Sequence, residues 1–515
     1  MAGRRAAAGC RNKENGAYRY QRHQPENTLL YRIVERYYPE FTAYLAEQGA
    51  SLPRYVEREF EAYLKCGRLE HGFLRVQCNN CHGEHLVAFS CKCRGFCPSC
   101  GARRMADNAA LLVDEVLPEQ PMRQWVLSFP YPLRFLFASQ PAIMTGVLGI
   151  VYRAIATHLI HKARYTRKTA HAGAVTLIQR FGSALNLNIH FHMLFLDGVY
   201  IAGAKDTTAR FHRVNESTSG ELTQLVHKIA HRVGRYLERQ GWLERDAEND
   251  YLALDTSDDD PFSVLQGHSI TYRIALGPQA GRKVFTLQTL PPVDIDEMHS
   301  AAVGEVAGFN LHAGVAARAD QRRKLERLCR YIARPAVSEQ RLSLTAQGKV
   351  RYQLKTPYRD GTTHVIFEPL DFISRLAALV PKPRVNLTRY HGVFAPNSQH
   401  RARVTPARRG RGNKAKASRP VAAQPAEWRA SMSWAQRLKR VFDIDIEICN
   451  VCGGSMKVIA CVEDPLVIKK ILTHLRGKGL YLEAAGLPRS RAPPQGDLFN
   501  RDTQAGPSTH QKLRT

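Results

Sequence analysis

Twelve cysteines lie unevenly along the 515-residue chain, and their spacing predicts metal binding. Cys78 and Cys81 form one Cys-x-x-Cys pair, Cys97 and Cys100 form another, and 15 residues separate the two pairs. Together the pairs offer four thiolates, which is the ligand set of a tetrahedral structural zinc site. We therefore predict that these four cysteines bind one Zn²⁺ ion, the alternative being thiols that pack as small apolar side chains.

Further cysteines leave room for a second zinc site. Four nearby residues are surplus to the first set and could form a second site or exchange with its members: Cys66, His71, Cys91 and Cys93. Near the other end of the chain, Cys449-x2-Cys452 is half of a zinc site, and the sequence leaves open whether zinc binds there. Two residues at irregular spacing could complete that half site: Cys461 and His474.

A histidine pair offers different metal chemistry. Residues 185–195 alternate between apolar and polar side chains, which predicts a half-buried strand with His190 and His192 on one face. The two histidines would lie about 7 Å apart at the backbone and could converge on one divalent ion. Gln179, on the preceding predicted strand, is a candidate third ligand. The alternative is a polar strand face that points to solvent.

A tyrosine among cations is the candidate nucleophile. Residues 320–334 show helical spacing, and Tyr331 lies about 110° from the middle of the apolar stripe on that helix. Positive charge around a phenol favours its ionised form and also binds phosphate. The alternative is an amphipathic tyrosine at the rim of the core. The cations that the helix places around Tyr331 are Lys324, Arg327, Arg330 and Arg334.

Both helices and strands must position these residues. Helical spacing covers residues 28–66 and begins again near Arg103, and an alternating region of strands and helices follows from about 120 to 400. The turn residues Asp360-Gly361 predict a hairpin between the last two strands. The predicted strands are 175–180, 185–196, 269–276, 284–290, 348–356 and 362–368.

The charge balance favours a polyanionic partner. The chain has 74 lysines and arginines against 46 aspartates and glutamates, a net charge of +28, which favours nucleic acid or an anionic membrane. Residues 135–152 lack charge, but Ser139-Gln140-Pro141 predicts a break there, so we expect no membrane span. The sequence shows no signal peptide, and we expect a cytoplasmic protein.

The order of these motifs resembles one protein family. A four-cysteine knuckle ends in Phe-Cys97-Pro-Ser-Cys100-x-x-Arg-Arg, Asn-Leu-Asn-x-His190-Phe-His192 follows on a strand, and Arg330-Tyr331-Ile-Ala-Arg334-Pro335 follows on a helix. Asp360-Gly-Thr-Thr-His364 and Arg389-Tyr390-His391-Gly392 come later. This order resembles the transposases of rolling-circle insertion sequences and common-region elements, within the HUH single-strand endonuclease superfamily.

The resemblance implies an α+β fold and a DNA-cleaving enzyme. Its core would be an antiparallel HUH nuclease sheet with helices, in which His190, His192 and Gln179 hold Mg²⁺ or Mn²⁺. Tyr331 would attack the scissile phosphate and form a 5′-phosphotyrosine. The partner would be DNA, mainly single-stranded or hairpin element ends, and the protein would associate with the bacterial nucleoid when bound to DNA. Six basic residues would contact that DNA: Arg103, Arg104, Lys324, Arg327, Arg330 and Arg334.

One position departs from the family pattern. Some members carry a second tyrosine four residues before the last one, and here that residue is Arg327. This implies a single-tyrosine cycle or cooperation between protomers in a homo-oligomer. Two other functions stay open: a rolling-circle replication initiator, and a non-catalytic zinc regulator that binds DNA.

The predicted organisation has six parts. A flexible basic arm comes first, then a helical zinc-binding domain, the catalytic domain, a basic linker, a C-terminal knuckle module and a disordered tail. Their predicted bounds are 1–27, 28–110, 111–399, 400–433, 434–485 and 486–515.

Overall fold

The structure is a computed structural model of the whole chain, and it describes most of the residues from 24 to 409 and a shorter C-terminal part. Most of the predicted arm and linker, and all of the predicted tail, lie outside the described residues. The described ranges are 18–19, 24–201, 210–245, 250–252, 260–291, 303–409, 444–445, 447–449 and 451–477.

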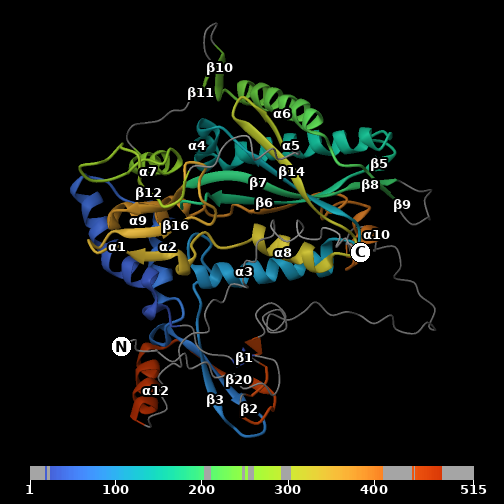
Figure 1. Ribbon diagram of the computed structural model, residues 1–515. Helices are drawn as coiled ribbons and strands as arrows, with labels where there is room; N and C mark the ends of the chain where they lie inside the picture. The colour runs from blue at the N-terminus through green and yellow to red at the C-terminus, as the bar shows by residue number, and fades with distance from the viewer. Residues whose placement is uncertain are drawn as a thin grey trace, which may run out of the picture.

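A six-stranded sheet forms the centre of the molecule (Figure 1). Every neighbouring pair in it is antiparallel, which confirms the predicted α+β class with antiparallel strands. The order is β13-β14-β4-β7-β6-β18, so the predicted histidine strand, β7, is flanked on both sides. The bounds are β13 Val303–Val306, β14 Phe309–Ala317, β4 Met122–Ser128, β7 Leu187–Leu196, β6 Gly173–Phe181 and β18 Thr388–Gly392.

Helices cover both faces of this sheet (Figure 1). One face packs against α4 (Tyr131–Ser139), α5 (Pro141–Lys162) and α6 (Ser219–Arg239). The other packs against α3 (Pro98–Leu111), its π-helical extension Leu112–Val116, and α8 (Arg322–Ile332). The prediction that β7 is half-buried is therefore wrong, because the face that carries its histidines is covered by α3 and α8.

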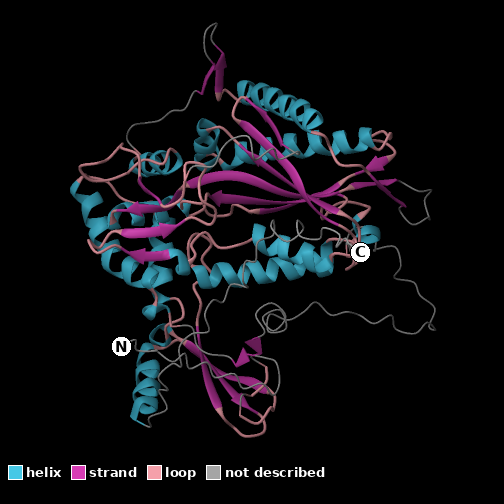
Figure 2. Ribbon diagram, viewed as in Figure 1, coloured by secondary structure: helices cyan, strands magenta, loops and turns pink. Residues whose placement is uncertain are grey.

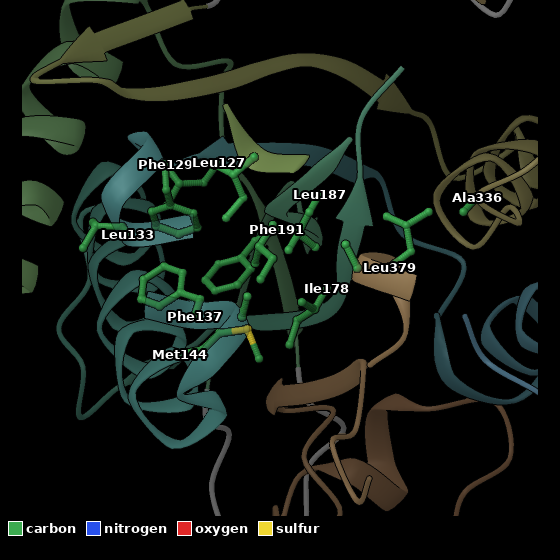
Figure 3. Close-up of a cluster of buried hydrophobic side chains, with 14 of the residues drawn as sticks. Leu127, Phe129, Leu133, Phe137, Met144, Ile178, Leu187, Phe191, Ala336 and Leu379 are labelled. Atoms are coloured by element: carbon green, nitrogen blue, oxygen red, sulfur yellow. The ribbon is translucent and has the colours of Figure 1, made fainter. Parts of the chain in front are cut away.

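The apolar face of β7 anchors the larger core (Figure 3). Phe191 stacks edge-on against Phe129, with ring centroids 4.9 Å apart, and Phe129 contacts Phe137 of α4 in the same way at 5.0 Å. Burial of one such aromatic side chain contributes about 1.5–3 kcal/mol. This packing holds β7 rigidly against α4 and α5.

Helix α5 is long and apolar enough to cross a bilayer by length and composition alone. It begins at Pro141, as the break at Ser139-Gln140-Pro141 predicts, and 61% of its most apolar window is buried inside the protein. The core helix of a globular protein meets the same criterion, so α5 is weak support for a membrane span.

A second sheet and its helices lie beside the central one. The predicted hairpin at Asp360-Gly361 is confirmed: β16 and β17 pair as antiparallel strands, and Gly361 takes the left-handed conformation with φ 83°. The sheet order is β12-β17-β16-β15, with bounds Phe285–Gln288, Thr362–Phe367, Val350–Gln353 and Leu342–Leu344. Four helices belong to this region: α1 Leu29–Glu47, α2 Arg54–Lys65, α7 Pro261–Ile270 and α9 Pro369–Leu379.

The predicted strand at 269–276 is wrong. Residues 261–270 form α7, which begins at Pro261 and is capped by the Asp260 carboxylate accepting a hydrogen bond from the Phe262 N–H. The alternation of apolar residues after 269 imitates a strand, but Tyr272 is in the left-handed region with φ 59°. A good helix start two turns earlier outweighs that alternation.

A smaller lobe joins an N-terminal segment of the chain to a C-terminal one. Figure 2 shows its three-stranded sheet below the central domain. The order is β20-β2-β3, so β20 (Met456–Val462) pairs with β2 (Phe73–Cys78), and β3 (Glu84–Ala88) lies on the other side of β2. Helix α12 (Pro465–Gly477) packs its buried Ile468 and Leu472 against this lobe. The segment that the sequence analysis treated as a separate C-terminal module thus shares a sheet with the N-terminal zinc region.

Short elements complete the described chain. Helix α10 (Arg401–Val404) lies at the start of the predicted linker, and Val404 and Thr405 there are buried. Helical turns at Pro25–Asn27, Leu69–His71 and Glu339–Arg341 connect longer elements. The remaining strands pair as β5-β8-β9 (Ala170–His171, Gly198–Ile201, Arg210–Arg213), β10-β11 (Leu243–Arg245, Asp250–Leu252) and β1-β19 (Tyr18–Arg19, Ile444–Asp445).

Candidate catalytic and zinc sites

The two histidines of β7 converge at their outer nitrogens. Nε2 of His190 lies 3.1 Å from Nε2 of His192, and both side chains are buried. His190 Nδ1 donates to the Asn188 carbonyl oxygen at 2.9 Å, because a carbonyl can only accept. With its proton on Nδ1, His190 carries a lone pair on Nε2, and a nitrogen in this form can bind a metal ion.

Strand register places Gln179 beside them. Gln179 of β6 is the direct partner of His190 across the β6–β7 ladder, so both side chains project from the same face. The Gln179 amide nitrogen donates to the Ile332 carbonyl oxygen of α8 at 2.9 Å. Within the described part of the chain, the buried Gln179 Oε1 atom has no hydrogen-bond partner. An unpaired buried oxygen next to two imidazoles suits a cation.

Burial keeps both imidazoles neutral. Removal from water lowers the pKa of His190 to about 4. The pKa of His192 is held well below its ordinary value, mainly by burial and then by the neighbouring His190. Neutral imidazole is the form that binds metals.

Tyr331 lies next to this pair. Its ring is perpendicular to that of His192, with centroids 6.3 Å apart. The Arg334 guanidinium lies 4.3 Å from the ring centroid, and the Lys355 ammonium lies 4.2 Å from it. Cations therefore surround the ring, as the helical spacing indicates, but Lys355 comes from the loop after β16 rather than from α8.

The other predicted DNA-binding residues have protein partners or are exposed. Arg330 forms an ion pair with Glu326, and Arg104 donates to the carbonyl oxygens of Lys92 and Cys93 at 2.9 and 3.1 Å. Arg103 donates to the Ser90 hydroxyl at 3.2 Å. Two remain on the outer side of α8, partly or fully exposed: Lys324 and Arg327.

A cavity of about 280 Å³ opens beside Gln179. One wall comes from the cysteine-rich segment and α3, and the other from β6 and the chain after α8. Five basic or aromatic residues line it: Arg94, Arg104, Arg180, Phe181 and Arg334. The cavity therefore lies between the cysteine-rich region and the strand that carries Gln179, and its lining does not include His190, His192 or Tyr331.

Among the described residues, eight cysteines form two clusters of four, and each cluster could hold a metal ion. The first consists of Cys66, Cys91, Cys97 and Cys100, whose Sγ atoms lie 3.4–3.8 Å apart in the three contacts they make. Three of the four thiols are buried. Four thiolates 2.3 Å from a tetrahedral ion would be about 3.8 Å apart, so the cluster matches zinc.

The second cluster consists of Cys78, Cys81, Cys449 and Cys452. The predicted site that combines Cys78 and Cys81 with Cys97 and Cys100 is therefore wrong. The reason is the β2–β3 hairpin, which carries the Cys78-x-x-Cys81 turn at its tip, away from the start of α3. Hydrogen bonds from turn N–H groups, chiefly that of Cys81, lower the pKa of Cys78 to about 6.

Comparison with family models identifies the relatives of both regions. A model described as "Putative transposase" matches residues 173–402, and a model described as "Transposase zinc-binding domain", of the IS91 type, matches residues 33–129. The chain belongs to the IS91-type transposases. DNA is therefore its substrate, and it is a nucleic-acid-processing enzyme. Comparisons with curated proteins and with solved structures found no match.

The matched regions correspond to the two halves of the site. The zinc-binding match contains the whole first cysteine cluster, so the transposase has a zinc-binding domain with a complete ligand set. The transposase match contains Gln179, the histidine pair and Tyr331.

Sequence reasoning missed one residue that orients the histidines. The Gln124 amide nitrogen of β4 lies 2.7 Å from His192 Nδ1, and Gln124 is buried in a strand whose other polar residues are Arg123 and Ser128. A polar residue in the middle of the buried run 122–128 is the sequence feature that could have revealed it.

Proposed function

We propose that this transposase cleaves and rejoins single-stranded DNA at the ends of a mobile element, through a 5′-phosphotyrosine on Tyr331. The observation that carries the proposal is the convergence of four side chains on one covered face of the sheet. His190 and His192 meet at Nε2, Gln179 faces them across the ladder, and the Tyr331 ring lies beside His192. We infer an HUH-type nuclease core from this arrangement.

The donor set fits a divalent cation. Two ligand nitrogens about 2.1 Å from an octahedral ion would be about 3.0 Å apart, close to the 3.1 Å between the two Nε2 atoms. Gln179 Oε1 would supply the oxygen ligand that Mg²⁺ and Mn²⁺ prefer. When bound, the ion supplies Lewis-acid polarisation of the scissile phosphate and offsets its charge.

The chain's own residues would position the nucleophile. The Tyr331 hydroxyl would attack phosphorus, the bond from phosphorus to the 3′ oxygen would break, and that oxygen would leave as a 3′-hydroxyl. Arg334 and Lys355 flank the ring and place positive charge where a phosphate would lie. The covalent link retains the phosphodiester bond energy, so the reverse attack by a 3′-hydroxyl can rejoin strands.

The cavity beside Gln179 supports an unpaired substrate strand. Arg94, Arg104 and Arg334 supply positive charge on both sides of it, and Phe181 offers an aromatic surface for a base. The Arg334 guanidinium also stacks on Phe181 at 5.3 Å, which holds that ring at the cavity wall. We propose that single-stranded or hairpin DNA enters here.

A single tyrosine would perform the cleavage. Arg327, which replaces the second tyrosine of some relatives, is exposed one turn before Tyr331. A second cleavage within one cycle would then need either the same tyrosine after its release or the Tyr331 of another protomer. Cooperation in a homo-oligomer and association with the nucleoid stay predictions.

The test is covalent capture of a single-stranded oligonucleotide from an element end, with Mg²⁺ or Mn²⁺ added. Wild-type protein should form an SDS-stable adduct that depends on the ion. Tyr331→Phe should form none, because the ring and its packing stay while the nucleophilic oxygen is lost. The double variant with His190→Ala and His192→Ala should bind the oligonucleotide but lose ion-dependent cleavage.

Tyr390→Phe is the matched control. Tyr390 is on β18, opposite Val175 rather than Gln179, and its ring contacts Arg401. This variant should form the adduct at the wild-type level. An adduct with Tyr331→Phe would refute the assigned nucleophile, and the absence of an adduct with any variant or wild type would favour a non-catalytic DNA-binding regulator.

A further inference from the structure

The second cysteine cluster takes its four thiols from segments about 370 residues apart in sequence. Cys78 Sγ lies 3.5 Å from Cys452 Sγ, and Cys81 Sγ lies 3.5 Å from Cys449 Sγ. All four sulfur atoms lie within 4.8 Å of one another. Two ligands come from outside the segment that matches the transposase zinc-binding domain.

Both Cys-x-x-Cys turns are built alike. The Asn80 N–H points to Cys78 Sγ at 3.4 Å, and the Val451 N–H points to Cys449 Sγ at the same distance. A left-handed residue follows each pair, His82 with φ 57° and Gly453 with φ 73°. Backbone N–H groups aimed at sulfur stabilise a thiolate, so each turn favours the metal-binding form of its first cysteine, Cys78 or Cys449.

Polar contacts hold the two turns face to face. The Asn79 N–H donates to the Ser455 carbonyl oxygen at 2.9 Å, and the Asn79 side chain donates to the Ser455 hydroxyl at 2.8 Å. A Cβ on Gly454 would lie 2.7 Å from the Asn80 side chain, so the approach requires glycine there. The β2–β20 ladder fixes the register, pairing Cys78 with Met456.

Four thiolates at this spacing need a cation between them. Their sulfur separations of 3.5 Å are too long for a disulfide bond, at about 2.05 Å, and close to the roughly 3.8 Å edge of a tetrahedral zinc–thiolate site. Cys81 and Cys452 are exposed, so packing alone does not account for the grouping. The separate contact between β1 and β19 again joins an N-terminal segment to a C-terminal one.

We propose that Cys78, Cys81, Cys449 and Cys452 bind a second zinc ion that closes a zinc ribbon between the N-terminal hairpin and the C-terminal segment of the same chain. Four Zn–S bonds form, and the thiol protons are released to solvent. This ion holds β20 and α12 on the small lobe. The proposal does not depend on the tyrosine chemistry, and its test uses no DNA.

Zinc content is the first measurement, made by elemental analysis on the full-length protein after dialysis. Wild type should hold two zinc ions per chain, and Cys449→Ser and Cys452→Ser should each hold one. Cys461→Ser is the matched control, because Cys461 lies on β20, is exposed and has its Sγ near Glu463 rather than in the cluster. It should hold two. One zinc in wild type, or two in both serine variants of the cluster, would overturn the proposal.

A ligand-preserving variant separates metal loss from misfolding. Cys452→His keeps a zinc ligand at the exposed corner of the site and should retain two zinc ions where Cys452→Ser retains one. If histidine and serine lower the zinc content equally, Cys452 is not a ligand, and the proposal fails.

A cleavage experiment tests whether the ribbon closes within one chain. A protease site is inserted between Lys416 and Ala417, and the full-length protein is cut there. The mass of the product is then measured by light scattering. The two fragments should stay together at the mass of one chain, and should separate when Cys449 and Cys452 are both serine. Fragments that separate in wild type, or a ribbon found only in a species of twice the mass, would overturn closure within one chain.

Discussion

The two cysteine clusters of this transposase differ in how their ligands are collected. The first takes all four from residues 66–100, and three of its thiols are buried. The second joins residues near 80 to residues near 450, and two of its thiols are exposed. The first cluster supports the start of α3, which packs against α8, the helix of Tyr331. The second supports only the small lobe.

The same set of four cysteine ligands can therefore have two different structural roles. A cluster closed within a short segment can fix a local framework before the rest of the chain folds around it. A cluster closed across the whole chain fixes how distant parts meet. We therefore expect damage to the first cluster to impair the proposed nuclease site, and damage to the second to leave that site working.

Cys100→Ser should have the largest effect. Removing a buried ligand at the start of α3 should release one zinc ion and destabilise the helical framework by on the order of 5 kcal/mol. Elemental analysis and denaturant unfolding would measure both changes, and the covalent-capture yield should fall with them. Cleavage at the wild-type level would contradict the predicted effect of this cluster on the site of Tyr331.

Gly101→Ala should have an intermediate effect at the contact between the two regions. An added Cβ at Gly101 of α3 would lie 2.6 Å from Pro335 Cβ, immediately after the tyrosine helix. The required shift should cost about 1–3 kcal/mol and slow cleavage, with zinc content unchanged. Single-turnover cleavage and unfolding would measure it.

Gly220→Ala is its control, at an early position of α6. An added Cβ there would meet nothing within 4 Å among the described residues. Helix propensity alone should then stabilise this variant by about 0.5–1 kcal/mol. Equal cleavage rates for the two alanine variants would contradict the proposed packing contact.

Cys452→Ser should have a small effect on catalysis. The second cluster is remote from the histidine face, so the cleavage rate should stay within about twofold, and the central domain should change in stability by less than about 0.5 kcal/mol. Single-turnover cleavage and denaturant unfolding, followed by tryptophan fluorescence, would measure these values. A loss of cleavage as large as that of Cys100→Ser would remove the distinction between the clusters.

The last prediction concerns only the order in which the two zinc ions leave the wild-type protein. A chelator reaches the exposed Cys81 and Cys452 before the buried thiols of the first cluster. Release followed with a zinc indicator dye should occur in two phases of one ion each, and cleavage should persist through the first. Cys452→Ser should lack the fast phase, and a single phase in wild type would contradict the ordering.

Local spacing in the sequence identified the Cys-x-x-Cys pairs, but it did not identify which residues lie beside them in the fold. Each Cys-x-x-Cys pair is visible because its spacing is local, but the partner of Cys78 depends on the β2–β20 pairing, which no local pattern encodes. Likewise, alternation places His190 and His192 on one face, while the register that brings Gln179 opposite His190 comes from the ladder. Sequence order implied the family, and the family models confirm it.

The other errors in the predictions from sequence have local causes. The strand expected at 269–276 was wrong because a helix start at Asp260-Pro261 lies just before the alternating run. Lys355 escaped notice because it comes to the Tyr331 ring from a different element, and helical spacing reports only neighbours on the same helix.

The position of β2 in the small lobe has a consequence for synthesis of the protein on the ribosome. β2 is the middle strand, with β3 on one edge and β20 on the other, and β20 is translated almost 400 residues after β2. Throughout that interval the nascent chain carries an unpaired β2 edge, which another polypeptide could occupy. A ribosome that stops before β20 would release a protein that contains His190, His192 and Tyr331 but leaves that edge open. Translation of β20 therefore determines whether the β2 edge is covered.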